Sequence, residues 1–164
     1  MCKFPKGTAD FEEIRTNGYV YIDKTKYIEL LENSGNKSVH LLRPKRFGKS
    51  LFTSMLQCYY DLKMSNAFDK LFKGTYIYEH PTEKKNQYYI LKFNFAGLGN
   101  KQGHELEKLF DRKVYIIISA FCEKYGFENT IPADSNAAQS LFNLIEILRN
   151  KIKNRRLYVL IDEL

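Results

Sequence analysis

Two short groups of residues in this sequence have the types and the spacing of a phosphate-binding site. The first is Gly48-Lys49-Ser50, which ends a basic loop and opens an amphipathic stretch. The second is the carboxylate pair Asp162 and Glu163, which follows the apolar run 157–161. A cation, a hydroxyl group and two carboxylates are the groups that bind nucleotide phosphates, hold Mg²⁺ and orient water.

The first group lies between a predicted strand and a predicted helix, and this context suits a phosphate. Backbone N–H groups and the positive end of the helix dipole would point at one spot, and Gly48 has no Cβ atom to block close approach. Lys49 would reach the β- and γ-phosphates, and the Ser50 hydroxyl would bind Mg²⁺. The alternative is a glycine turn followed by a capped helix with solvated basic side chains.

The loop before this helix departs from the P-loop pattern GxxxxGK[ST], because Arg43 stands where the pattern has its first glycine. Its basic residues either contact phosphates or are solvated and attract an anion through their long-range field. The predicted nucleotide-binding residues are Arg43, Pro44, Lys45, Arg46, Phe47, Gly48, Lys49, Ser50 and Leu51.

The second group follows the last predicted strand of the chain. In open α/β sheets, ligands bind beyond the carboxyl ends of the strands. Asp162 would therefore hold Mg²⁺, directly or through a water molecule, and Glu163 would orient and polarise the attacking water. The alternative is a strand that ends in an exposed acidic turn.

Predicted strands alternate with predicted helices along the chain. The strands are expected at 19–22, 38–42, 88–95 and 157–161, and the helices at 24–32, from 49 onward, and at 66–72, 103–124 and 137–153. Asp23 is expected to cap the helix 24–32. We expect 38–42 to be buried and 157–161 to be apolar on both faces. The pattern indicates an α/β fold with a parallel sheet flanked by helices.

Composition bounds the class of protein. The chain has 164 residues, 44% of them hydrophobic, which allows one folded domain and argues against disorder. The net charge of +7 would suit a polyanion, so nucleic acid is a secondary partner hypothesis. The three cysteines form no CxxC pair, and no apolar stretch approaches membrane-spanning length, so we expect a cytoplasmic protein with reduced thiols and no membrane contact.

The segments 14–15, 18–25, 42–51 and 160–163 together resemble the AAA-ATPase-like family of bacterial P-loop proteins. The most specific piece is Arg43–Leu51, because the family characteristically has RPRRFGKS there, so Arg43 agrees with the resemblance. The resemblance covers nearly the whole chain. It implies ATP binding at Lys49 and Ser50, with Asp162 and Glu163 as the Walker B pair. The matching residues at 19–25 are explained by strand packing and a helix cap, and we assign them no chemistry.

The resemblance also implies an AAA- or RecA-like P-loop NTPase fold. In the strand order 5-1-4-3-2, the strand between the two motif strands comes later in sequence. We therefore expect residues 1–164 to be the N-terminal part of one P-loop domain, truncated after the Walker B strand. Its C-terminal strands, its sensor residue, any arginine finger and the PD-(D/E)XK nuclease-like domain of many members would be absent, so this chain alone should bind and hydrolyse ATP weakly.

The leading functional hypothesis is an ATP- and Mg²⁺-binding NTPase module that uses hydrolysis to change the conformation of an attached domain or partner. Lys49 and Glu163 are its expected catalytic residues, and Ser50 and Asp162 its expected metal ligands. One alternative is a small-molecule kinase with the same P-loop, although an acid directly after Asp162 favours hydrolysis. The other is a basic nucleic-acid-binding domain without catalysis, either through its own surface or through the missing C-terminal domain.

Overall fold

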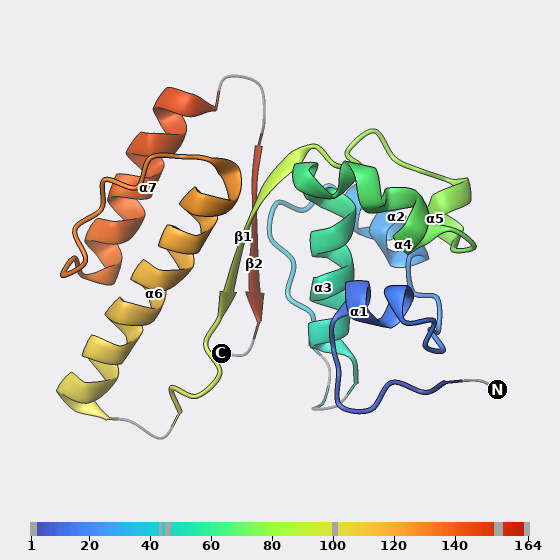
Figure 1. Cartoon of the computed structure of the whole chain (residues 1–164), viewed down its shortest axis with the longest axis horizontal. Coiled ribbons are helices and arrows are strands. Elements are labelled where there is room, and N and C mark those ends of the chain that lie inside the picture. The colour runs from blue at the N-terminus through green and yellow to red at the C-terminus, as the bar shows by residue number, and fades with distance from the viewer. Residues whose placement is uncertain (1–2, 43, 45–46, 100–101, 153–155, 163–164) are drawn as a thin grey trace. The chain divides into compact units, whose positions relative to one another are not determined.

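A computed structural model describes residues 3–42, 44, 47–99, 102–152 and 156–162. The chain divides into two compact units, Met1–Tyr88 and Tyr89–Leu164. Figure 1 shows the elements, which in chain order are α1 (Phe11–Thr16), α2 (Lys26–Asn33), α3 (Lys49–Tyr60), the 3₁₀ helix η1 (Leu62–Ala67), α4 (Phe68–Phe72), α5 (Tyr76–Glu79), β1 (Tyr88–Asn94), α6 (Gly103–Tyr125), α7 (Ala137–Lys151) and β2 (Arg156–Asp162).

The first unit is helical and has an aromatic core. Helix α1 packs against α3 and α4, and Phe11, Tyr59 and Phe72 from these three helices are fully buried. The ring centroids of Phe11 and Phe72 are 5.0 Å apart, and those of Tyr59 and Phe72 are 5.6 Å apart. These contacts fix α3, the helix that begins with Lys49.

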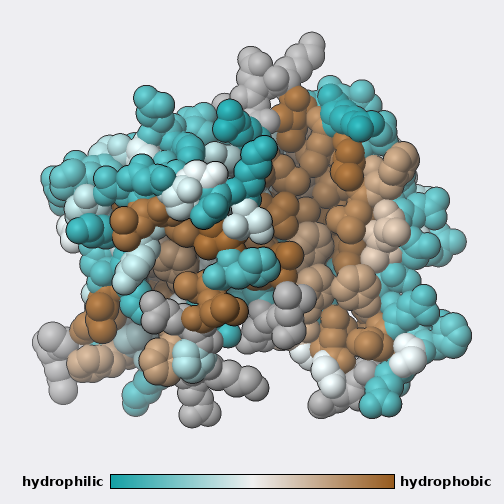
Figure 2. Space-filling model, turned by 180° about the vertical axis from the view of Figure 1, so that it is seen from behind, coloured by the Kyte–Doolittle hydropathy of each residue, from teal (hydrophilic) through white to brown (hydrophobic). Residues whose placement is uncertain are grey.

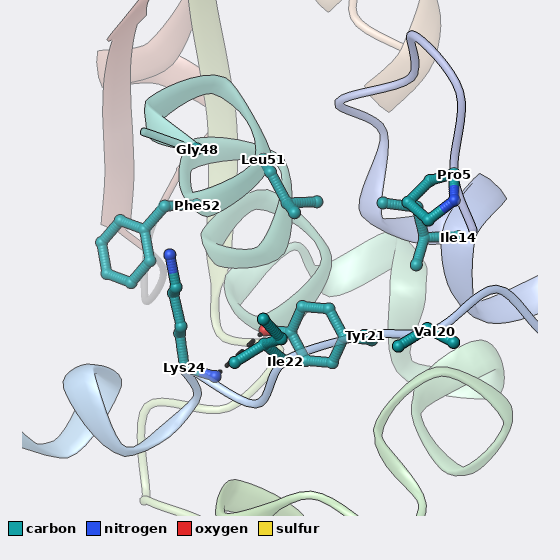
Figure 3. Close-up of a pocket in the computed structure, with 9 residues that line it drawn as sticks. All are labelled: Pro5, Ile14, Val20, Tyr21, Ile22, Lys24, Gly48, Leu51 and Phe52. Atoms are coloured by element: carbon teal, nitrogen blue, oxygen red, sulfur yellow. Dashed lines mark hydrogen bonds between the residues drawn. The ribbon is translucent and has the colours of Figure 1, made fainter. Parts of the chain in front are cut away.

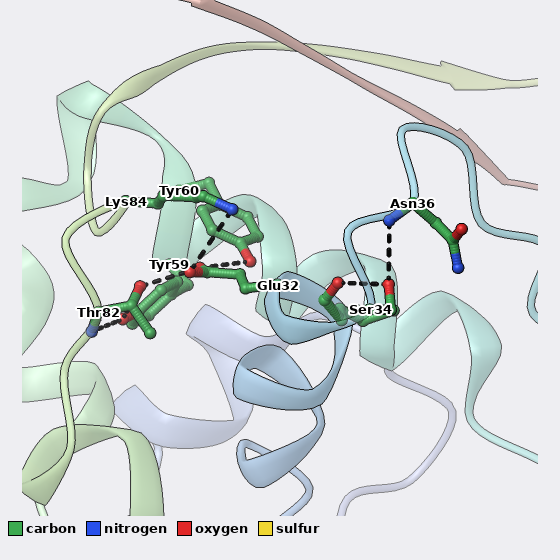
Figure 4. Close-up of polar contacts among 8 residues, drawn as sticks. Glu32, Ser34, Asn36, Tyr59, Tyr60, Thr82 and Lys84 are labelled. Carbon is green, nitrogen blue, oxygen red and sulfur yellow. Dashed lines mark hydrogen bonds and ion pairs between the residues drawn. The ribbon is translucent and has the colours of Figure 1, made fainter.

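A polar network holds the other end of α3. One Glu32 carboxylate oxygen accepts hydrogen bonds of 2.9 Å from the hydroxyl groups of Tyr60 and Thr82 (Figure 4). The other oxygen lies 3.8 Å from the ammonium group of Lys84. Because Glu32 is on α2 and Tyr60 ends α3, the network joins the two helices that lie before and after the basic loop that precedes Gly48.

The two short strands predicted in the first unit are wrong. In 19–22, Tyr19 alone forms a β-bridge, with Lys3, and the segment 38–42 forms no strand. Its apolar side chains are not buried, since Leu42 is 89% exposed. A strand requires a neighbour that accepts its backbone hydrogen bonds. In the described part of the chain no strand is hydrogen-bonded to 38–42.

The predicted cap at Asp23 is also wrong. Helix α2 begins at Lys26 after the N-cap residue Thr25. The Asp23 carboxylate instead accepts hydrogen bonds from the backbone N–H groups of Thr25 (2.8 Å) and Tyr76 (2.7 Å). Asp23 therefore binds the first turn of α5, which is distant in sequence.

The second unit contains a two-stranded parallel sheet, β1 next to β2, with helices α6 and α7 beside it (Figure 1). The predictions of these four elements are confirmed, including helix for the β-branched run 114–118. Tyr125 at the end of α6 binds the sheet, because its hydroxyl accepts a 2.8 Å hydrogen bond from the Ile90 N–H group. The chain is thus a mixed α/β protein with a small parallel sheet flanked by helices.

Strand β2 is covered on one face, although the run 157–161 is apolar on both faces. Leu160 and Asp162 are buried, whereas Val159 and Ile161 are 46% and 52% exposed. An apolar run is buried on both sides only where elements cover both faces of the sheet.

None of the helices that the structure describes combines the length and the apolar character that a membrane crossing demands.

Candidate functional site

Gly48, Lys49 and Ser50 lie at the start of helix α3, which begins at Lys49 as predicted. Gly48 is the N-cap residue and adopts the left-handed conformation (φ 75°, ψ 26°). The Phe52 N–H group donates to the Gly48 carbonyl oxygen at 2.9 Å and forms the first turn of the helix. The N–H groups of Lys49, Ser50 and Leu51 precede this helical bond and point from the positive end of a 12-residue helix.

The side chains of this turn differ in how far they are buried. Lys49 and Ser50 are half-buried, whereas Phe47 is 62% exposed. Among the carboxylates that the structure describes, none pairs with Lys49. The Ser50 carbonyl oxygen accepts a 2.9 Å hydrogen bond from the Thr53 hydroxyl group, which holds the first turn of α3.

A cavity of about 200 Å³ lies next to this turn (Figure 3). Leu51 and Phe52 contribute one wall from α3, and Ile14 contributes from α1. The complete lining is Pro5, Ile14, Val20, Tyr21, Ile22, Lys24, Gly48, Leu51 and Phe52. The walls are largely apolar, with the Lys24 ammonium group and the Gly48 backbone as polar parts.

Tyr21 is the titratable aromatic residue of this cavity. Burial raises the pKa of its hydroxyl group to about 12. The hydroxyl group donates to the Met55 sulfur atom at 3.2 Å and accepts from the Lys24 N–H group at 3.4 Å. Tyr21 is therefore neutral near physiological pH and adds no charge beside Gly48.

Asp162, from the second predicted group, is the last residue of β2 and is 6% exposed. One oxygen of its carboxylate lies 4.0 Å from the ammonium group of Lys92 on β1. Its carbonyl oxygen accepts a 3.2 Å hydrogen bond from the Phe95 N–H group, which fixes the carboxyl end of the strand. The carboxylate thus lies at the end of a parallel strand, as the sequence predicts, and has a cation beside it.

The structure describes part of the predicted site. Arg43, Lys45, Arg46 and Glu163 lie outside the described residues. Helix α3 brings Gly48, Lys49, Ser50 and Leu51 together, and Pro44 and Phe47 precede them in exposed positions. Asp162 belongs to the second compact unit.

Sequence reasoning missed two lysines beside these groups. Lys92 interrupts an otherwise apolar and aromatic strand, and that interruption is a signal in the sequence. Lys24 lies between two residues that bind α5, and its ammonium nitrogen is 3.6 Å from the position that a Cβ atom on Gly48 would occupy. The described residues contain no cluster of three or more His, Cys, Asp or Glu side chains arranged to hold a metal ion.

Similarity to known proteins identifies the family of this chain. No solved structure gives a significant match. The chain is 32% identical over 107 residues to an uncharacterized protein in the vnfD 5′ region of Azotobacter chroococcum mcd 1. That match covers 64% of this chain and 19% of the relative, so it spans about a fifth of the relative's length. Residues 5–164 match the family described as Predicted AAA-ATPase, and the chain belongs to this family.

Proposed function

We propose that this chain binds ATP with Mg²⁺ at the first turn of α3. In the whole protein, hydrolysis of that ATP would change the conformation of an attached domain or partner. One observation carries the proposal: a left-handed glycine is followed directly by Lys49 and Ser50 at the start of a 12-residue helix. Membership of a predicted AAA-ATPase family supports the choice of nucleotide.

The phosphates would bind at the N-terminus of α3. A phosphate oxygen can approach the Gly48 backbone closely, because no Cβ atom is present. The helix end acts as roughly half a positive charge, and Lys49 adds a full charge one residue later. Lys49 is assigned to the β- and γ-phosphates, and the loop residues Arg43, Lys45 and Arg46 are assigned as further phosphate contacts.

The residues assigned to Mg²⁺ suit this ion. The Ser50 hydroxyl and the Asp162 carboxylate are oxygen donors, which Mg²⁺ prefers, and phosphate oxygens and water would supply its remaining ligands. When bound, Mg²⁺ neutralises charge on the phosphate oxygens. Glu163 follows Asp162 directly and is assigned to orient the attacking water, which favours hydrolysis over transfer to a substrate hydroxyl group.

The cavity beside Gly48 suits the nucleoside part of the ligand. Its walls are apolar and it includes two aromatic side chains, Tyr21 and Phe52. Nucleotide sites combine an apolar region for the base with a few polar groups that fix orientation. Here the polar groups are those of the phosphate-binding turn, which borders the same cavity.

The test is a titration of a fluorescent ATP analogue into the full chain with Mg²⁺, after circular dichroism shows that the chain is folded. Lys49→Ala should weaken binding at least about tenfold, because a hydrogen bond to a charged group contributes about 1.5–3 kcal/mol. Lys70→Ala removes an exposed lysine of α4 and should bind as the unmodified chain does. Equal binding by Lys49→Ala and the unmodified chain would contradict the proposal.

The same two variants separate this function from nucleic-acid binding. A basic surface that binds DNA would do so in a strongly salt-dependent way and without any need for Lys49. We expect loss of ATP binding in Lys49→Ala whether or not DNA is present. DNA binding that persists in this variant, together with no ATP binding by the unmodified chain, would favour the nucleic-acid alternative.

A further inference from the structure

Lys24 lies between two side chains that are fixed to another element. The Asp23 carboxylate accepts the Tyr76 N–H group at 2.7 Å, and the Thr25 hydroxyl oxygen accepts the Ile77 N–H group at 3.1 Å. Both acceptors therefore bind the first turn of α5. Thr25 is fully buried, so the backbone on either side of Lys24 is held in place.

The Lys24 side chain is directed toward the start of α3 instead. Figure 3 shows it extending from the segment before α2 toward Gly48 and Phe52. Its ammonium nitrogen lies 3.6 Å from the position of a Cβ atom built on Gly48. Within the described part of the chain, no carboxylate forms an ion pair with this group.

This placement brings positive groups together without a protein anion among the described residues. The N-terminus of α3 carries a partial positive charge, Lys49 begins the helix, and the Lys24 ammonium group lies over the residue before it. Like charges repel one another. An anionic ligand between them would convert this repulsion into attraction.

We propose that Lys24 is a further nucleotide-binding residue, whose ammonium group contacts the phosphate that lies against the Gly48 backbone. The inference rests on the proposed function, because it assigns a second cation to the same site. In P-loops the backbone cradles the α- and β-phosphates, whereas the motif lysine reaches the β- and γ-phosphates. Lys24 therefore serves the phosphates that ATP and ADP share, and Asp23 and Thr25 position it.

The test compares fluorescent analogues of ATP and ADP on the full chain. Lys24→Gln keeps most of the side-chain length and removes the charge, and it should weaken binding of both nucleotides about tenfold. Lys24→Arg should retain most of the affinity. Lys37→Gln, an exposed lysine elsewhere in the same unit, is the matched control and should bind both nucleotides as the unmodified chain does.

The salt dependence supplies a readout that a purely structural role would not change. Because the contact is electrostatic and Lys24 is exposed, the affinity ratio between the unmodified chain and Lys24→Gln should shrink as salt is raised to about 1 M. Equal thermal unfolding midpoints for the two proteins are expected, since Lys24 donates no side-chain hydrogen bond within the described residues.

Each outcome separates this inference from the function on which it rests. Unchanged ATP and ADP affinity in Lys24→Gln, with binding lost in Lys49→Ala, would overturn the role of Lys24 and leave the proposed function standing. A loss for ATP with none for ADP would overturn the assignment to the shared phosphates. No nucleotide binding by the folded, unmodified chain would overturn both proposals.

Discussion

Tyr21, which lines the cavity beside Gly48, makes the free energy of unfolding depend on pH. Burial raises its pKa to about 12, compared with about 10 in an unfolded chain. The folded state therefore holds the proton more tightly, and the free energy of unfolding should fall as pH rises from about 10 to about 12. Tyr21→Phe has no proton to lose at this position, so denaturant titrations should show a shallower fall over this range.

Other tyrosines contribute to the remaining alkaline slope. Burial raises the pKa of Tyr59, and a hydrogen bond to the Glu29 carboxylate raises the pKa of Tyr76. Tyr27→Phe is the matched control, because it removes the hydroxyl group of an exposed tyrosine outside the cavity. An alkaline slope in Tyr21→Phe as steep as that of the unmodified chain would contradict the account of Tyr21.

Asp162 is the residue for which a metal role and a structural role are most easily separated. Its partner Lys92 has a side chain that is 28% exposed, so water can solvate the ammonium group when the pair is lost. Because the Asp162 carboxylate is buried, Asp162→Asn should lower the free energy of unfolding by about 1–3 kcal/mol in a denaturant titration. It should also raise the Mg²⁺ concentration required for half-maximal binding of the ATP analogue.

A Mg²⁺ titration at a fixed concentration of the ATP analogue measures this effect. Asp134→Asn neutralises an exposed carboxylate in the loop before α7 and is the matched control. An unchanged Mg²⁺ midpoint in Asp162→Asn would count against the metal role of this residue.

The residues that sequence reasoning found and missed differ in one respect. Gly48, Lys49 and Ser50 are adjacent in the chain, so their relation to a helix start is visible in the sequence. Lys24 and Lys92 matter because of what lies beside them in space, and their positions depend on contacts with distant segments. No local spacing rule contains that information.

At the scale of elements, helix α5 depends on side chains far away in the sequence. It has four residues and is too short to be stable alone. Its Ile77 N–H group donates to the buried Thr25 hydroxyl oxygen. Thr25→Val keeps the shape of the side chain and removes the acceptor, so it should cost about 1–3 kcal/mol of unfolding free energy in a denaturant titration.

Thr25→Ser is the control for this effect, because it retains the hydroxyl group and loses one methyl group. It should remain closer in stability to the unmodified chain than Thr25→Val does. Equal stability of Thr25→Val and the unmodified chain would show that another group satisfies the Ile77 N–H group.

The long helices were predictable, and the short strands were not. Helices α3, α6 and α7 have apolar residues at intervals of three and four, and their backbone hydrogen bonds are internal to each helix. The segment 38–42 is equally apolar, but a strand depends on a neighbouring segment. Strands β1 and β2 lie on either side of two predicted helices, and each is the hydrogen-bonded neighbour of the other.

At the scale of the whole molecule, some segments with an apolar sequence have exposed side chains. Figure 2 shows apolar side chains exposed on the face in view. Among the residues that the structure describes, the large apolar ones that are more than half exposed are Phe4, Ile22, Leu30, Val39, Leu42, Phe47, Ile116, Phe142 and Ile161. A sequence pattern identifies apolar segments, whereas burial also requires an element that covers them.

The α/β class and the two groups of candidate site residues could be predicted from the sequence for different reasons. Alternation of strands and helices follows from local patterns, and a two-stranded parallel sheet realises it in the second unit. The two predicted groups, at Gly48 and at Asp162, belong to different compact units. The proposal that both groups act on one nucleotide is therefore tested only with ligand bound.

Hydrogen–deuterium exchange of the full chain, with and without ATP and Mg²⁺, tests most directly whether the nucleotide binds where we propose. The backbone N–H groups of Lys49, Ser50 and Leu51 should exchange more slowly when ATP is bound, because phosphate oxygens would accept hydrogen bonds from them. Lys49→Ala at the same ATP concentration should show less slowing. ATP bound at saturation with unchanged exchange at these three residues would contradict the account.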